Sequence, residues 1–216
     1  MKETTGKSCV STNGPKQDCR QKIIDFALKY NKSQDPLHIF TMPSKYHRCY
    51  DMFKETFKTA QIDSVERDKQ IAYDLRKKGI YTHTCTTTEF FANIRDFDQP
   101  YDILFLDYYG HYTKAISNEL DMIISNNNIT PNNKPFVLAV TLSKSIRQSN
   151  ADNIKDIRKK SSTRINEVFD YNINTLSAAL LELFKNLIIY DTYVTEYKVS
   201  QKSVPMFFLC YALQKR

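Results

Sequence analysis

Short apolar segments alternate with amphipathic segments along most of the chain, and this alternation limits the fold more than any other feature. Strands are expected at 37–42, 61–65, 80–85, 103–106 and 135–142, and helical spacing of apolar residues occupies most of the segments between them. The run PFVLAVTL at 135–142 is nearly continuous in apolar residues, as strands are when helices cover both faces of a sheet. The pattern therefore predicts an α/β fold with a parallel sheet and right-handed crossovers.

The C-terminal part of the chain adds two more strands. Residues 187–198 and 205–213 are separated by a short polar turn, so we expect them to pair as an antiparallel hairpin. A long helix is expected before them, at 163–185. The complete prediction is a doubly wound, mostly parallel seven-stranded sheet with a C-terminal antiparallel hairpin and helices on both faces.

The 216 residues are enough for one sizeable core, whereas two domains would each be small. Residues 1–17 are polar and rich in Lys, Ser, Thr and Gly, so we expect a disordered or flexible tail there. Residues 18–216 are expected to form a single Rossmann-like domain. Its first element is a short amphipathic helix at 18–31, with Asp18 in position to cap it.

Composition suggests an intracellular protein, cytoplasmic or nuclear. No apolar run is long enough to cross a bilayer, so no membrane contact is expected, and the N-terminus lacks the apolar middle of a signal peptide. The five cysteines are scattered without CxxC spacing, which indicates reduced thiols rather than disulfides or zinc ligands. We expect no metal site, and the oligomeric state is not predicted.

The formal net charge of +7 favours an acidic partner, and nucleic acid is the commonest one for such a protein. The segment Lys144–Arg164 carries seven basic residues against two acidic ones and directly follows the strand at 135–142. We expect it to form a basic rim that binds nucleic-acid phosphates, with RNA favoured. A solvated loop and helix face is an equally good interpretation.

Acidic residues follow two of the expected parallel strands. Glu66 ends the segment SVE, and Asp107 comes directly after ILFL. The carboxyl ends of parallel strands meet at one edge of a sheet, and ligands of such folds bind in the crevice at that edge. We therefore expect these two carboxylates to face a common crevice.

The order of strands and helices from about residue 36 onward resembles the class I S-adenosylmethionine-dependent methyltransferases. The resemblance implies S-adenosylmethionine as the cofactor, bound where the strand order reverses. It also implies that Glu66, with its neighbour Arg67, lies at the cofactor ribose, because a carboxylate can accept hydrogen bonds from two hydroxyls. The other cofactor-binding positions carried over by this resemblance are Thr41, Pro43, Ser44, Cys85, Thr86 and Asp107.

The segment LDYYGH at 106–111 is weakly similar to the Asp-Pro-Phe-Gly motif of tRNA guanine-N2 methyltransferases, with which it shares an acid, an aromatic residue and a glycine. In the family this segment lies beside the reactive methyl group. A flat base could stack on tyrosine rings while a carboxylate accepts its exocyclic N–H. The catalytic candidates that follow are Asp107, Tyr108, Tyr109, His111 and Lys144.

One departure from the family leaves a second hypothesis open. The family places a glycine-rich turn after the first strand, whereas this chain has Thr41-Met42-Pro43-Ser44-Lys45. The alternative to a methyltransferase is therefore a Rossmann-like binding or scaffolding protein without this activity. GxGxxG, P-loop and GxSxG motifs do not occur, which argues against ordinary NAD binding, NTP hydrolysis and serine esterase chemistry.

Overall fold

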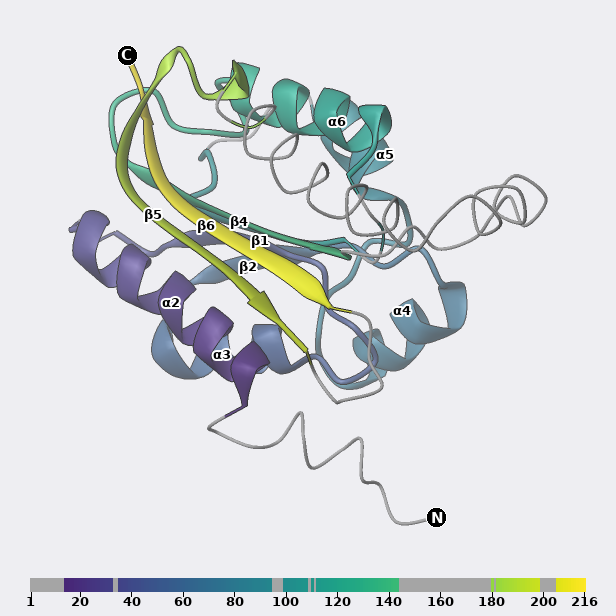
Figure 1. The fold of residues 1–216 in the computed structure, drawn as a ribbon. Coiled ribbons are helices and arrows are strands. Elements are labelled where there is room, and N and C mark those ends of the chain that lie inside the picture. The colour runs from purple at the N-terminus through teal and green to yellow at the C-terminus, as the bar shows by residue number, and fades with distance from the viewer. Residues whose placement is uncertain are drawn as a thin grey trace, which may run out of the picture.

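A six-stranded β-sheet forms the centre of the described part of the chain in the computed structural model, which covers residues 14–32, 35–94, 99–108, 110, 112–143, 180, 182–198 and 205–216. The strands are β1 (His38–Thr41), β2 (Gln61–Ser64), β3 (Ile103–Asp107), β4 (Phe136–Ser143), β5 (Leu187–Tyr197) and β6 (Met206–Lys215). Their order across the sheet is β2-β1-β3-β4-β6-β5 (Figure 1).

The first four strands of this order are parallel, and β6 is antiparallel to both of its neighbours. The chain therefore runs outward from β1 to β2 and then returns to the other side of β1 to form β3. That reversal is the point at which doubly wound sheets bind ligands. The predicted α/β class, parallel sheet and C-terminal antiparallel hairpin are confirmed.

The predicted seventh strand is not formed among the described residues. In segment 80–85 only His83 pairs with the sheet, through an isolated parallel bridge to Val65. Two residues before His83, the backbone carbonyl of Tyr81 accepts a hydrogen bond from the side chain of Ser64, whose Oγ lies at 2.9 Å. The hydroxyls of Ser64 and Thr82 lie 3.0 Å apart. Two backbone bonds form the bridge beside these contacts, from the His83 N–H to the Ser64 carbonyl and from the Glu66 N–H to the His83 carbonyl.

Helices cover both faces of the sheet, as predicted (Figure 1). Helices α2 (Pro15–Tyr30) and α3 (Arg48–Thr56) lie on one face, while α5 (Thr87–Ala92) and α6 (Lys114–Ser125) lie on the other. Helix α4 (Lys69–Lys77) follows β2. Helix α2 contacts β4, β5 and β6, so the first helix of the described residues packs against the C-terminal strands.

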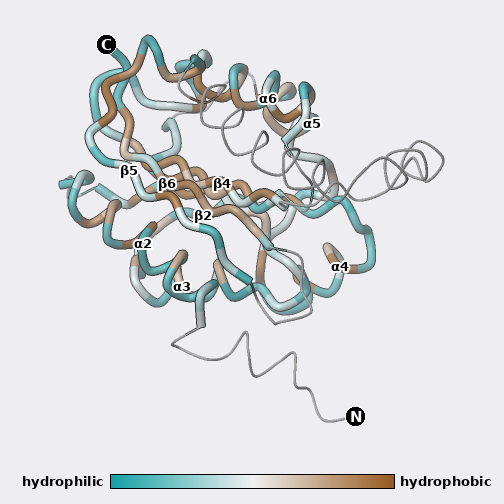
Figure 2. Tube along the Cα trace, in the orientation of Figure 1, coloured by the Kyte–Doolittle hydropathy of each residue, from teal (hydrophilic) through white to brown (hydrophobic). Residues whose placement is uncertain are grey.

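Two apolar clusters, one on each face, form the core. All eight residues of β4 are buried, as expected for a central strand covered on both sides. Its alternate residues divide between the clusters, so Leu138 packs with α6 residues such as Ile123, and Val137 packs with α2 residues such as Ile23. Figure 2 shows that hydrophobic residues are concentrated along the central strands of the sheet.

The helix ends follow local sequence signals. Asp68, at the N-cap of α4, accepts hydrogen bonds from the backbone N–H groups of Gln70 and Ile71. Gly79 follows this helix with φ 80°, a conformation that glycine adopts at little cost. At α5, Thr86 and Glu89 form a reciprocal capping box.

The start of α2 differs from the prediction. The helix begins at Pro15, with Gly14 at the N-cap, rather than at Asp18. Proline suits the first helical position because its ring fixes φ near the helical value and the missing N–H would have no intrahelical partner there. Of the predicted tail, residues 14–17 are thus ordered, and residues 1–13 lie outside the described residues.

Most of the helix predicted at 163–185 lies outside the described residues; Leu180 and residues 182–183 are helical. Within the part of the chain that the structure describes, no helix combines the length and the hydropathy that a membrane crossing requires.

Candidate functional site

A cavity of about 650 Å³ lies at the carboxyl edge of the parallel strands, next to the reversal between β1 and β3. Its volume is within the range of small-molecule sites, roughly 300–1,000 Å³. The lining comes from the segments that follow β1, β2, the 80–85 segment and β3, together with α2 and α6. The residues are Lys16, Met42, Pro43, Ser44, Val65, Glu66, Arg67, Cys85, Thr86, Thr87, Asp107, Tyr108, Gly110 and Ile116.

Glu66 and Asp107 both line this cavity, as the sequence predicts. They follow β2 and end β3, the two strands that flank β1. Glu66 is half-buried, and its Oε1 accepts a hydrogen bond from the Asp68 N–H at 2.9 Å. That bond fixes the carboxylate at the cavity wall, while its neighbour Arg67 is exposed at the rim.

The turn after β1 reaches the cavity without glycine. Pro43 is buried and Ser44 exposed, and both line the cavity. The turn closes through a bond from the His47 N–H to the Ser44 carbonyl at 2.8 Å, and His47 adopts the left-handed conformation with φ 42°. His47 thus supplies the positive φ that glycine usually provides in such turns.

Thr41 does not line the cavity, contrary to its predicted place in the cofactor site. It is fully buried between Ser64 of β2 and Phe105 of β3, to which its backbone pairs. The physical reason is that Thr41 is the last ladder residue of β1, so the chain opens toward the cavity only at Met42.

Cys85 and Thr86 lie on the cavity wall between β2 and α5. Cys85 is half-buried rather than fully buried, and burial raises the pKa of its thiol, which keeps it protonated and unreactive at neutral pH. Thr86 is exposed at the N-cap of α5, where its hydroxyl and backbone bond to Glu89.

Lys16, in the first turn of α2, enters the same cavity and was not a predicted site residue. Its Nζ lies 3.1 Å from Asp107 Oδ2, and both side chains are largely buried. Burial by itself would lower the pKa of the Lys16 amine, but attraction to Asp107 outweighs it, and the net shift is upward. Lys16 therefore stays charged, and Asp107, a predicted catalytic and cofactor-binding residue, has a cationic partner.

The Tyr108 ring forms part of the cavity wall, and its hydroxyl points into the protein. The hydroxyl donates to Glu119 of α6, and a second hydroxyl, that of Thr88, donates to the other oxygen of the same carboxylate. Tyr108 and Glu119 are both buried, and burial together with the Glu119 carboxylate raises the pKa of Tyr108 far above its ordinary value. The Tyr108 oxygen therefore stays protonated.

Three catalytic candidates, Tyr109, His111 and Lys144, lie outside the described residues, as does the basic segment Lys144–Arg164. Gly110, which lies between the first two, lines the cavity. Within the described residues, no group of three or more His, Cys, Asp or Glu side chains could hold a metal ion.

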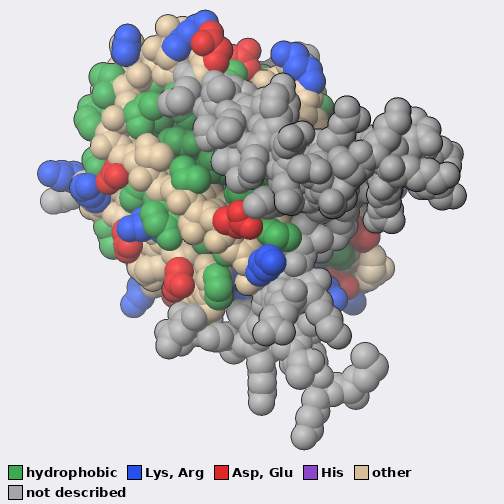
Figure 3. Space-filling model, in the orientation of Figure 1, with side chains coloured by type: hydrophobic (Ala, Val, Ile, Leu, Met, Phe, Trp, Pro, Cys, Tyr) green, Lys and Arg blue, Asp and Glu red, His purple; other side chains and the backbone are tan. Residues whose placement is uncertain are grey.

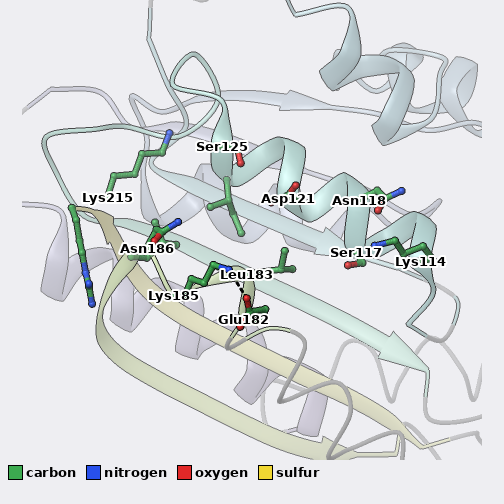
Figure 4. Close-up of a pocket in the computed structure, with 13 residues that line it drawn as sticks. Lys114, Ser117, Asn118, Asp121, Ser125, Glu182, Leu183, Lys185, Asn186 and Lys215 are labelled. Carbon is green, nitrogen blue, oxygen red and sulfur yellow. Dashed lines mark hydrogen bonds and ion pairs between the residues drawn. The ribbon is translucent and has the colours of Figure 1, made fainter.

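A second cavity, of about 410 Å³, runs along α6 toward the start of β5 and the end of β6 (Figure 4). Charged residues line it, and two of them, Lys185 and Glu182, form an ion pair with each other. Its β-strand residues, Leu187 and Lys215, lie at the amino end of β4, away from the crevice where doubly wound folds bind ligands. We therefore assign the functional site to the first cavity.

These features define a Rossmann-like α/β domain with a ligand-sized cavity at its strand reversal. Solved structures with a similar fold include proteins named as methyltransferases. The plantazolicin methyltransferase BamL, in complex with a triazolic desmethylPZN analog and SAH, is 8% identical with a TM-score of 0.59 over 92% of this chain and 84% of that one. The plantazolicin methyltransferase BpumL, in complex with a monoazolic analog and SAH, is 9% identical with a TM-score of 0.56 over 92% of this chain and 83% of that one.

The N-methyltransferase NodS from Bradyrhizobium japonicum WM9 is 7% identical with a TM-score of 0.53, over 94% of this chain and 99% of that one. No protein-family profile and no curated protein sequence matches the chain. At these identities the likeness establishes the Rossmann-like methyltransferase fold. It does not by itself assign a reaction.

Proposed function

We propose that this protein is an S-adenosylmethionine-dependent methyltransferase that acts on nucleic acid, with RNA as the favoured acceptor. The observation that carries the proposal is the cavity at the strand reversal, which Glu66 and Asp107 line from the two strand ends on either side of β1. The fold shared with methyltransferases that are solved with SAH (S-adenosylhomocysteine) supports the same reaction class.

The residues that line the cavity fit this cofactor chemically. Glu66 is acceptor-only and suits the two ribose hydroxyls, with Arg67 beside it. Cys85 and Thr86 form the wall next to Glu66 and suit the adenine, which leaves the β3 side, at Asp107, for the amino-acid end. Pro43 and Ser44 form the floor between these two ends.

S-adenosylmethionine would supply a methyl group whose bond to sulfur breaks as the bond to the acceptor atom forms, leaving SAH and a released proton. The protein contributes mainly alignment of the two reactants and exclusion of water. Tyr108 lines the cavity, and we assign its ring to stacking against a flat acceptor. Asp107 accepts a hydrogen bond from Lys16 at the end of β3. The sequence candidates Tyr109, His111 and Lys144 belong to this part of the proposal.

Charge supports a nucleic-acid acceptor. The chain carries a net charge of +7, and the segment Lys144–Arg164 has seven basic residues against two acidic ones. In the sequence this segment directly follows Ser143, the last residue of β4. By contrast, basic and acidic side chains are interspersed over the described part of the face in Figure 3. We therefore propose the basic segment as the phosphate-binding rim.

Thermal denaturation with SAH tests the cofactor. A ligand at 100 times its Kd stabilises a protein by about 2.7 kcal/mol, or about 5–11 °C for a chain of this size. We expect Glu66→Ala to lose this shift without unfolding, whereas Glu55→Ala, which removes an exposed acid on α3, should keep it. If millimolar SAH leaves the wild-type melting temperature unchanged, the scaffolding hypothesis is favoured instead.

Transfer of a labelled methyl group tests the acceptor. We expect label from S-adenosylmethionine to enter unmodified RNA in preference to DNA or protein. Transfer should weaken as salt rises, because phosphate contacts release counterions. Label that enters only protein or small molecules would contradict the nucleic-acid part of the proposal and leave the cofactor part standing.

A further inference from the structure

Lys16, in the first turn of α2, has a charged side chain that lines the cavity. Its amine lies 3.1 Å from Asp107 Oδ2, and the two residues belong to elements 91 positions apart in sequence. Both line the cavity, and their side chains are only 29% and 18% exposed. A lysine that served only for solubility would extend into water, so this placement requires another explanation.

The turn after β1 is poor in backbone donors for an anion. Pro43 has no N–H, and the N–H groups of Tyr46 and His47 already bond to the Ser44 side chain and carbonyl. Glycine-rich turns of doubly wound folds present successive free N–H groups to anionic ligands. A site built on this turn needs a positive charge from elsewhere, and Lys16 brings one.

The Lys16–Asp107 pair matches a zwitterion. An α-amino acid carries an ammonium and a carboxylate on one carbon. Its two charges are therefore close enough together to pair with the adjacent side chains of Asp107 and Lys16. The carboxylate then lies against Lys16 and the ammonium against Asp107. The other cation of the described cavity lining, Arg67, follows β2 beside Glu66, which the proposed function assigns to the ribose.

From this arrangement we infer that Lys16 determines specificity by binding the carboxylate of the cofactor's amino-acid end, with Asp107 binding the ammonium. The inference rests on the proposed function, and it makes Lys16 a cofactor-binding residue supplied by the N-terminal helix rather than by the strand ends. A purely structural pair would instead only fasten α2 to β3.

Two ligands that differ in the amino-acid end distinguish these roles. SAH has the complete amino acid, whereas 5′-methylthioadenosine keeps the adenosine and sulfur and lacks both charges. Calorimetry should show that Lys16→Met weakens SAH binding roughly 10- to 100-fold, as loss of a charge-assisted hydrogen bond predicts, and leaves 5′-methylthioadenosine within about twofold.

Lys29→Met is the matched control, because Lys29 lies on the same helix and also joins it to the sheet, through Asp191 at 2.8 Å. It should change neither affinity. If wild-type protein binds SAH and Lys16→Met binds it equally well, or loses both ligands equally, this inference is overturned and the proposed function survives. If wild-type protein binds neither ligand, both fall together.

Discussion

Glu119 gives the sharpest test of the packing behind the cavity. It lies on α6 with 6% of its surface exposed, and its two carboxylate oxygens accept the hydroxyls of Tyr108 and Thr88. Glu119→Ala removes both acceptors. Thr88 is exposed, so its hydroxyl can turn to water, but Tyr108 is buried and its hydroxyl is left without this acceptor.

The expected cost follows from these two environments. Loss of a buried hydrogen bond to a charged group costs about 1.5–3 kcal/mol, and the lost side-chain packing adds to it. We expect Glu119→Ala to lower the free energy of unfolding by about 3 kcal/mol, or the melting temperature by about 6–12 °C. Asp121→Ala removes an exposed acid on the same helix and should stay within about 0.5 kcal/mol of wild type.

A double-mutant cycle shows whether the Tyr108 hydroxyl is the cause. Tyr108→Phe alone should cost about 1.5 kcal/mol, but in the Glu119→Ala background it removes an unpaired hydroxyl and should cost nothing or stabilise. The coupling energy from urea unfolding is therefore expected to be about 1.5–2 kcal/mol. Additive effects of the two substitutions would refute this reasoning.

Two further predictions concern β2 and the turn after β1. Burial opposes ionisation of Asp63, but hydrogen bonds from His38 and Tyr101 at 2.8 Å each outweigh it and lower its pKa. Its stabilising contribution is therefore complete above its unfolded pKa of about 4 and is lost as pH falls toward the lower folded value. As pH is lowered, the free energy of unfolding should fall less steeply for Asp63→Asn than for the wild-type protein. Identical pH profiles would contradict the pairing. His47 has φ 42°, so His47→Val should be less stable than His47→Gly by about 1–2 kcal/mol in thermal unfolding. Equal stability of the two variants would argue against backbone strain at this position.

The predicted site residues differ in what local sequence could reveal. Glu66 and Asp107 could be predicted because each lies at the end of an expected apolar strand, and the carboxyl ends of parallel strands lie at one edge of the sheet. Glu119 carried a weaker signal, an acid one helical turn before the buried Ile123 on an otherwise apolar face. The exclusion of Thr41 had no such signal, since it depends on where the β1 ladder ends.

The sequence by itself determined the α/β class, the parallel strands, the terminal hairpin and the caps of α4, because these depend on residues close together in the chain. Only the tertiary structure decided that segment 80–85 forms one bridge instead of a strand, since local sequence does not determine how many residues of an edge segment pair with β2. It also placed Lys16 against Asp107. No local pattern encodes that contact, because it arises only when α2 packs across β4 and β6 and turns its first residues toward the end of β3.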